Sequence, residues 1–260
     1  MNDLRISFLQ FDIAWEDKQR NLEYIKSQIH ALKGKSNLLV LPEMFTTGFT
    51  NNCHPLAESM DGPTIQQLKQ LAHHNDLAIA GSLLIVENNN FYNRFVFIHP
   101  TGDIQYYDKK HLFRLGAEVK NFTAGKTHTI VSYLGWHIAL QVCYDLRFPV
   151  WSRNKNNSYD LLLYTANWPD SRIAAWEILL QARAIENMAY VCGVNRVGTD
   201  GNNLFYSGRS LLFDPKGRLL GQGGNKSEEA CITLSLSKDN LDHFRQKFPV
   251  WEDADAFTID

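Results

Sequence analysis

The chain has 260 residues, of which 44% are hydrophobic and 21% are charged, and its net charge is -2. This ordinary globular composition is sufficient for a large core, and we expect one domain over residues 1–260 with a C-terminal tail from about residue 248. The small net charge gives no electrostatic reason to expect a nucleic acid or an anionic membrane as a partner.

Apolar runs and alternating patterns predict strands along the whole chain. In chain order these strands cover residues 4–11, 37–41, 77–86, 91–98, 104–107, 129–133, 136–142, 159–165, 190–197, 209–213, 219–220 and 231–236. Helical spacing predicts one helix that opens at Trp15 and ends at Gly34, one that starts at Pro63, and two more over residues 173–188 and 239–247. Residues 115–126 look irregular. Mixed strands and helices in pairs favour two sheets covered by outer helices.

The four cysteines lie far apart, and no C-x-x-C motif is present, which argues against a zinc knuckle or a thioredoxin-like site. Cys192 and Cys231 fall in predicted strands, and Cys53 falls in a predicted loop without the partners that a catalytic or metal site requires. We expect these three thiols to be inert. The N-terminus shows no signal-peptide pattern and no run is apolar enough to span a bilayer, so we expect a cytoplasmic protein with reduced thiols.

The fourth cysteine stands at a junction between a strand and a turn. The apolar run from Ile138 to Val142 predicts a buried strand, and Pro149 restricts the backbone a few residues later. Cys143 directly follows that strand, so the sheet holds one side of its thiol while the other side can face a cleft. Free cysteine is also a common core residue, so this stretch alone leaves both roles open.

Two further residues share the position of Cys143. Glu43 and Lys109 each follow the end of a predicted strand, although either could also be a solvated loop residue. If the three strands are neighbours with parallel ends, the three side chains meet at one rim. A thiol attacks as the thiolate, a carboxylate can accept its proton, and a lysine can stabilise negative charge on the attacked oxygen.

Three separate motifs resemble, in the same order, those of the nitrilase superfamily of carbon–nitrogen hydrolases. They are Leu41-Pro-Glu-Met-Phe45, Tyr107-Asp-Lys-Lys-His-Leu-Phe113 and Val142-Cys-Tyr-Asp-Leu-Arg-Phe-Pro149. The resemblance covers essentially the whole chain. It implies an α/β fold, a four-layer αββα sandwich of two mixed sheets with outer helices, and a Glu-Lys-Cys catalytic set.

The same resemblance implies a role for each motif residue. Glu43 would be the general base, Cys143 the nucleophile of a thioester pathway, and Lys109, rather than its neighbour Lys110, the cation. A second glutamate after the lysine motif looks like Glu118. The family's oxyanion site would combine Lys109 with the backbone N–H of Tyr144. No metal, nucleotide or organic cofactor is implied.

Further stretches are similar to the bacterial omega-amidase branch of this superfamily. They are residues 43–49, Asn167-Trp-Pro, and residues 182–187, 193–201 and 248–255. That branch hydrolyses the terminal amide of 2-oxo dicarboxylic acid monoamides such as 2-oxoglutaramate and releases ammonia. Another small-amide or N-carbamoyl hydrolase of the superfamily is the alternative, and a non-catalytic nitrilase-like binding scaffold is a more remote one. A papain-type hydrolase would need a histidine motif that the chain lacks.

An oxo acid amide carries a carboxylate, which the planar fork of an arginine suits. Arg172 and Arg114 are candidates for this contact, although each could also be a surface residue, whereas we expect Arg147 to be structural and directed inward beneath the Cys143 turn. Three aromatic residues could form apolar walls of the site or belong to the core: Phe45, Trp168 and Tyr144.

The resemblance also implies a homodimer or higher homo-oligomer. The region after Cys143 and the C-terminal tail would pack across the two-fold axis. The apolar residues available for such an interface are Phe148, Val150, Trp151 and residues 248–251.

Overall fold

Two six-stranded sheets form the centre of the computed structural model, which describes residues 3–258. In spatial order, the strands of the first sheet are β14 (Ala230–Leu236), β1 (Leu4–Gln10), β2 (Leu38–Val40), β3 (Ala78–Glu87), β4 (Asn90–Ile98) and β5 (Ile104–Asp108). Those of the second sheet are β13 (Leu219–Gln222), β12 (Leu211–Phe213), β9 (Tyr190–Asn195), β8 (Leu161–Ala166), β7 (Trp136–Val142) and β6 (Ile130–Tyr133). Each sheet contains both parallel and antiparallel pairs.

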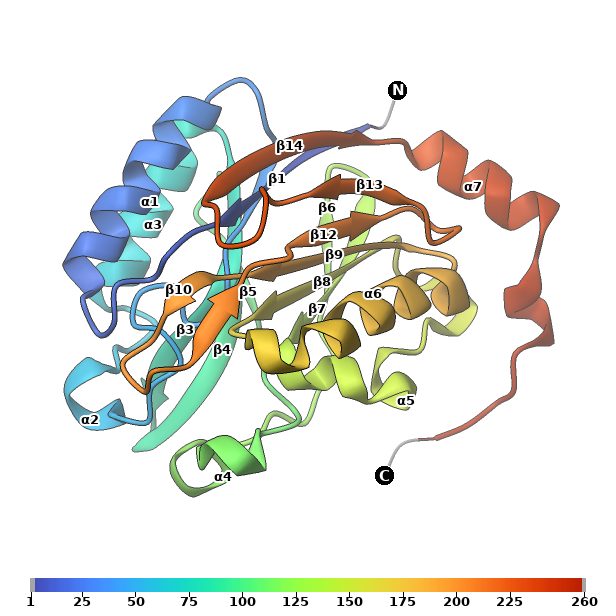
Figure 1. Cartoon of the computed structure of the whole chain (residues 1–260). Coiled ribbons are helices and arrows are strands. Elements are labelled where there is room, and N and C mark those ends of the chain that lie inside the picture. The colour runs from blue at the N-terminus through green and yellow to red at the C-terminus, as the bar shows by residue number, and fades with distance from the viewer. Residues whose placement is uncertain (1–2, 259–260) are drawn as a thin grey trace.

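Helices cover the outer face of each sheet. The α-helices are α1 (Lys18–Leu32), α2 (Cys53–Leu56), α3 (Pro63–Asn75), α4 (Glu118–Asn121), α5 (Pro149–Ser152), α6 (Ile173–Asn187) and α7 (Lys238–Lys247). Figure 1 shows α1 and α3 on one side of the molecule and α6 on the other, with the two sheets between them. The expected four-layer αββα sandwich is therefore confirmed.

Alternation along the strands assigns side chains to the layers. In β1, Ile6 and Phe8 belong to the core between the sheets, whereas Leu9 belongs to the core beneath α1 and α3. The apolar face predicted for the first helix is confirmed, because its four members are all buried against the first sheet: Leu22, Ile25, Ile29 and Leu32. On the other side, Trp176 and Leu180 of α6 pack against the outer face of the second sheet.

Local chemistry moves some element boundaries from the predicted positions. The first helix starts at Lys18 rather than Trp15, because the Asp17 side chain accepts a hydrogen bond from the backbone N–H of Arg20 at 3.0 Å and caps the helix there. The strand predicted over residues 190–197 ends at Asn195. The chain then leaves the second sheet and forms a separate hairpin of β10 (Val197–Thr199) and β11 (Phe205–Ser207), which the sequence analysis did not foresee.

The segment expected to be irregular, residues 115–126, contains two short pieces of helix. One is a 3₁₀ turn over Arg114–Gly116, and the other is α4. Cys53, which was expected in a loop, is the first residue of α2. None of these three short helices could be recognised from the sequence, because segments this short carry no amphipathic period.

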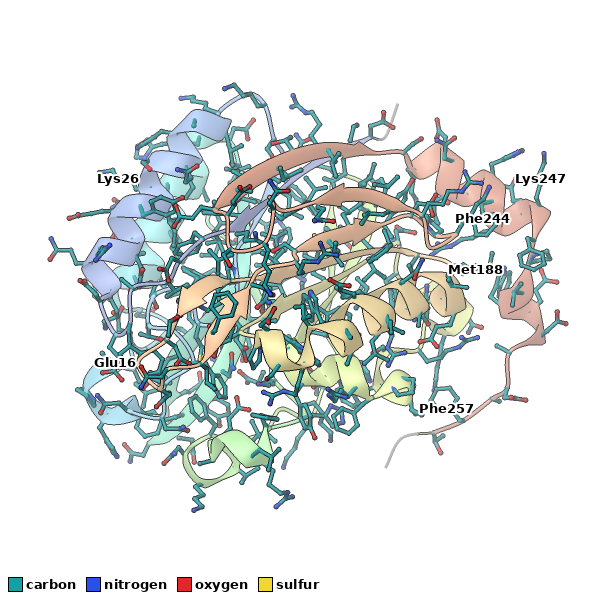
Figure 2. All side chains as sticks on the ribbon, in the orientation of Figure 1. Glu16, Lys26, Met188, Phe244, Lys247 and Phe257 are labelled. Carbon is teal, nitrogen blue, oxygen red and sulfur yellow. The ribbon has the colours of Figure 1, made fainter. Side chains whose placement is uncertain are left out.

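The C-terminal helix is attached to the second sheet by a buried arginine. Arg245 of α7 donates to Asp160 at 2.9 Å and to the carbonyl oxygen of Met188 at 2.9 Å. Figure 2 shows Phe244 and Lys247 on α7 at one edge of the molecule, with Phe257 further along the C-terminal segment. Within residues 3–258, no helix is both long enough and apolar enough to cross a membrane.

Candidate active site

The strands that precede Glu43, Lys109 and Cys143 are not neighbours, so the premise of the predicted convergence is wrong. β2 and β5 belong to the first sheet but are separated by β3 and β4, and β7 lies in the second sheet. β5 nevertheless runs in the same direction as β2. β2 and β3 are parallel, and the antiparallel pairs β3–β4 and β4–β5 reverse the direction twice. Since β7 packs against β5 across the inter-sheet core, residues after all three strands still meet at one end of the sandwich.

A buried ammonium group joins two buried carboxylates at this end of the sheets. The Lys109 Nζ atom donates to Glu43 Oε1 at 2.9 Å and lies 3.1 Å and 3.0 Å from Glu118 Oε1 and Oε2. All three side chains are fully buried, with 0% exposure for each. The Asn93 amide bridges the carboxylates, donating to Glu43 at 2.7 Å and to Glu118 at 3.2 Å. These contacts hold the four side chains as a unit.

The second oxygen of Glu43 is held from the opposite sheet. The backbone N–H of Asn167, directly after β8, donates to Glu43 Oε2 at 2.8 Å. The Asn167 side-chain amide donates to the carbonyl oxygen of Glu43 at 2.6 Å. Both ends of the glutamate are therefore fixed, and its carboxylate spans the gap between the two sheets.

Cys143 sits at a sharp change of backbone direction. It follows β7 directly, opens a 3₁₀ helix over Cys143–Arg147, and has φ of 45°, a conformation that non-glycine residues seldom adopt. Its thiol donates to the carbonyl oxygen of Asn167, which lies 4.0 Å from the sulfur, and the Glu43 carboxylate is near enough to raise the pKa of the thiol. The side chain is partly exposed and lines a cavity. Backbone strain of this kind clusters at functional sites.

Asp145, which the sequence analysis did not single out, holds this turn in place. Its buried carboxylate accepts four hydrogen bonds, of which two come from Tyr107 Oη at 2.8 Å and from the backbone N–H of Val142 at 3.0 Å. The other two come from the backbone N–H and Nδ1 of His111, at 2.9 Å and 2.7 Å. Asp145 thus ties the loop that carries Lys109 to the turn that carries Cys143.

The charges of the cluster perturb one another. Burial lowers the pKa of Lys109, but Glu118 and Glu43 outweigh burial and keep it above its usual value. Burial raises the pKa of Glu118, and Glu43 adds to this while Lys109 opposes it. Burial and the adjacent Glu43 raise the pKa of the Cys143 thiol well above its usual value, because two carboxylates face one ammonium. The resting thiol is therefore protonated and needs a base for attack.

A cavity of about 410 Å³ opens onto Cys143, Glu43 and Lys109. Its walls come from five parts of the chain: Phe49 and Asn51, the segment around Phe113 to Ala117, the turn of Tyr144 and Arg147, the loop around Trp168 to Arg172, and the β10–β11 hairpin. Tyr144, Trp168 and Arg172 line it, and their wall and binding roles stay predictions.

The structure decides three side-chain positions: it chooses between the open alternatives for Phe45 and Arg114, and it shows that the position expected for Arg147 is wrong. Phe45 is completely buried in the core beneath α1 and α3 and does not line the cavity. Arg114 is exposed and also lies outside the cavity lining. Arg147, expected to point inward as a structural residue, is exposed and lines the cavity, with its guanidinium 5.0 Å from the centre of the Trp168 ring. The side of a turn toward which an arginine points depends on packing that the motif does not encode.

Burial raises the pKa of each of the other cysteines, to about 11 for Cys53. None of Cys53, Cys192 or Cys231 lines the cavity, whereas Cys143 does. Within residues 3–258, no group of three or more His, Cys, Asp or Glu side chains is arranged to hold a metal ion.

Comparisons with known proteins also indicate a carbon–nitrogen hydrolase. A family model described as carbon–nitrogen hydrolase matches residues 5–245. The chain is 42% identical to omega-amidase YafV of Escherichia coli (strain K12) over 259 residues, with 100% of both chains covered. It is 35% identical to 2-oxoglutaramate amidase of Bacillus subtilis (strain 168), covering 95% of this chain and 96% of that relative. The structure of the chain also matches the crystal structure of XC1258 from Xanthomonas campestris, with a TM-score of 0.97, 42% identity and 100% of both chains covered. That structure is described as a CN-hydrolase superfamily protein with an arsenic adduct in the active site.

Proposed function

This chain belongs to the carbon–nitrogen hydrolase family, and from that premise we propose that it is an omega-amidase that releases ammonia from 2-oxo dicarboxylic acid monoamides such as 2-oxoglutaramate. The observation that carries the proposal is the buried Lys109, held between Glu43 and Glu118 beside the Cys143 thiol at a cavity. The names of the two relatives support the choice of substrate class.

In the first half of the reaction, Cys143 Sγ attacks the amide carbonyl carbon while Glu43 accepts the thiol proton. Glu43 is suited to this because its carboxylate lies near the thiol and is held through both of its oxygens, by Lys109 and by the backbone N–H of Asn167. The carbonyl oxygen becomes an oxyanion, which the Lys109 ammonium and the backbone N–H of Tyr144 stabilise. The C–N bond then breaks, Glu43 returns the proton to the leaving nitrogen, and ammonia departs from an acyl thioester on Cys143.

In the second half, water hydrolyses the thioester. Glu43 takes a proton from the attacking water, the same donors stabilise the second oxyanion, and the thiolate leaves and recovers its proton. Glu118 touches neither substrate nor sulfur in this scheme. It fixes Lys109 Nζ, and its own carboxylate is fixed by the backbone N–H of Phe113 at 2.6 Å, so it acts as a positioning residue.

The cavity fits a small acid amide. Its volume of about 410 Å³ lies at the lower end of the range of roughly 300–1,000 Å³ that is usual for small-molecule sites. Arg172 at the cavity wall would bind the substrate carboxylate, whereas Arg114 is no longer a candidate because it lies outside the lining. Trp168 and Tyr144 would flank the carbon chain.

The protein is further proposed to act as a homodimer. Val150 and Phe248, in the two regions expected at the two-fold axis, are 55% and 59% exposed. Trp151 is not available for the interface, because it is buried within the inter-sheet core of its own chain. Large exposed apolar side chains such as these favour burial against a second copy.

The test is ammonia release from 2-oxoglutaramate by the wild type, Cys143→Ala and Cys231→Ala. Cys231 is a matched control, because it is a partly buried strand thiol remote from the cavity lining. We expect Cys143→Ala to retain less than about 1% of wild-type kcat/KM, which corresponds to a loss of about 2.7 kcal/mol or more of transition-state stabilisation. Cys231→Ala should keep wild-type activity.

A second measurement separates the nucleophile from the substrate. Intact-protein mass spectrometry of rapidly quenched reactions should show an acyl adduct on the wild type and none on Cys143→Ala. Activity retained by Cys143→Ala would refute the nucleophile. Absence of ammonia and adduct from the wild type would refute the substrate class and require a panel of other amides and N-carbamoyl compounds.

A further inference from the structure

Two arginines face the cavity without an anionic partner. Within residues 3–258, the guanidinium groups of Arg147 and Arg172 form no ion pair and no hydrogen bond, although both residues line the cavity. Each lies instead over an aromatic ring, Arg147 at 5.0 Å from the centre of Trp168 and Arg172 at 5.2 Å from that of Phe113. Such stacking holds a guanidinium in place and leaves its N–H donors free.

Trp168 joins the two arginines into one structural unit. Its ring lies beneath the Arg147 guanidinium, and its indole Nε1 donates to the carbonyl oxygen of Arg172 at 2.8 Å. Trp168 is itself 3% exposed, so this support is rigid. Both cations therefore border the cavity onto which Cys143 opens.

The acidic residues in the cavity lining are already neutralised or fully bonded. Glu43 is paired with Lys109. Asp200 accepts hydrogen bonds from the backbone N–H groups of Asn202 and Leu204 and from Tyr206 Oη, at 2.8 Å, 3.0 Å and 2.8 Å. The part of the cavity beyond the catalytic cluster thus offers two free cations and no free anion to a ligand.

A monocarboxylate requires only one of the two guanidinium groups, so the second must meet another electron-rich group. Arg147 belongs to the same 3₁₀ helix as Cys143, whereas Arg172 lies on a separate loop. In a 2-oxo acid amide, the oxo group stands one carbon nearer the reacting amide than the carboxylate does. This order matches Arg147 to the oxo oxygen and Arg172 to the carboxylate.

We propose that Arg147 is a specificity-determining residue that binds the 2-oxo oxygen of the substrate, and that the Arg147–Arg172 pair thereby excludes amino acid amides. The inference rests on the proposed function. In glutamine, an ammonium group replaces the oxo group. The ammonium would then face the Arg147 guanidinium, and no carboxylate would be present to accept the hydrogen bonds of the ammonium. An unpaired charge of this kind, placed in a site that presents donors to an acceptor, discriminates strongly against the wrong ligand.

The experiment compares kcat/KM for three five-carbon amides: 2-oxoglutaramate, glutaramate without a substituent at carbon 2, and L-glutamine. The variants are Arg147→Gln, Arg147→Lys and Arg218→Gln, the last a control on an exposed arginine outside the cavity lining. In Arg147→Gln, we expect kcat/KM for 2-oxoglutaramate to fall about 10- to 100-fold while that for glutaramate stays within about threefold of wild type. Arg147→Lys should recover part of the loss, and Arg218→Gln should match wild type.

The outcomes separate this inference from the proposed function. A wild type inactive on all three amides would refute the proposed function. The role of Arg147 alone would be refuted if the wild type cleaves 2-oxoglutaramate but Arg147→Gln does not change the preference between the two substrates. That outcome covers a variant that loses activity equally on 2-oxoglutaramate and glutaramate, and one that loses activity on neither. Wild-type discrimination of less than about tenfold against glutamine would also overturn the inference. Melting temperatures measured for each variant should match that of the wild type, which would show that folding is retained.

Discussion

Replacing Asp145 by asparagine tests how the Cys143 turn is held. The carboxylate accepts hydrogen bonds from Tyr107, Val142 and twice from His111, at 2.7 to 3.0 Å. An asparagine keeps one oxygen, so about two of the four donors would meet an amide N–H group instead of an acceptor. Hydrogen bonds to charged groups contribute about 1.5–3 kcal/mol each, so Asp145→Asn should lower the free energy of unfolding by about 3–6 kcal/mol.

The same change should also lower activity in the molecules that fold. Asp145 ties the turn of Cys143 to the loop of Lys109, so its loss should displace the sulfur from Glu43 and the oxyanion donors. Misplacement of a reacting group by about 1 Å can lower the rate about 100-fold, and we expect kcat to fall by that order. The assays are urea denaturation and kcat per folded molecule.

Asp160→Asn is the matched control for this prediction. Asp160 is also a buried carboxylate with several partners, including Arg245 at 2.9 Å and the backbone N–H of His137 at 2.9 Å, but it does not line the cavity. Both variants should lose stability, and only Asp145→Asn should lose kcat. An Asp145→Asn protein that is destabilised to the same extent as the control, with kcat within about twofold of wild type, would refute the positioning role.

Two other predictions concern pH and assembly. Burial and Glu43 raise the pKa of Glu118, so Glu118 should take up a proton at a higher pH than an ordinary glutamate does. Its protonation leaves Lys109 with one anionic partner. As the pH is lowered, kcat/KM should therefore begin to fall at this higher pH. Glu118→Gln should be less active and flat over this range in a pH–rate profile, and an acid limb that is identical in both proteins would contradict this. Light scattering should report a dimer through the regions of Val150 and Phe248, and a monomer at micromolar concentration would contradict that.

Much of the fold could be predicted because short-range patterns encode it. The apolar face of α1 and the buried strands β2 and β7 follow from side-chain periodicity, which each segment carries without reference to any other. The three motifs around Glu43, Lys109 and Cys143 are also local, since each is a strand followed by a chemically distinctive residue. The hairpin of β10 and β11 escaped prediction because it requires the chain to leave the sheet at Arg196, whose buried side chain pairs with distant Asp12.

The partners of the site residues could not be predicted in the same way. Asn93 lies within β4, where nothing in the sequence distinguishes it from any polar strand residue, yet it contacts Glu43 from 50 positions away. Asp145 lies inside a recognised motif, but its role depends on Tyr107 and His111, which the packing of the second sheet on the first brings to it.

The sequence by itself determined most of the longer strands and helices, and which residues carry a thiol, a carboxylate or an ammonium after a strand. Only the tertiary structure decided that Phe45 turns into the core, that Arg114 stays outside the cavity and that Arg147 faces it. The physical reason is that periodicity acts over a few residues, whereas the direction of a side chain on a turn is set by the elements packed against it, and these come from remote parts of the chain.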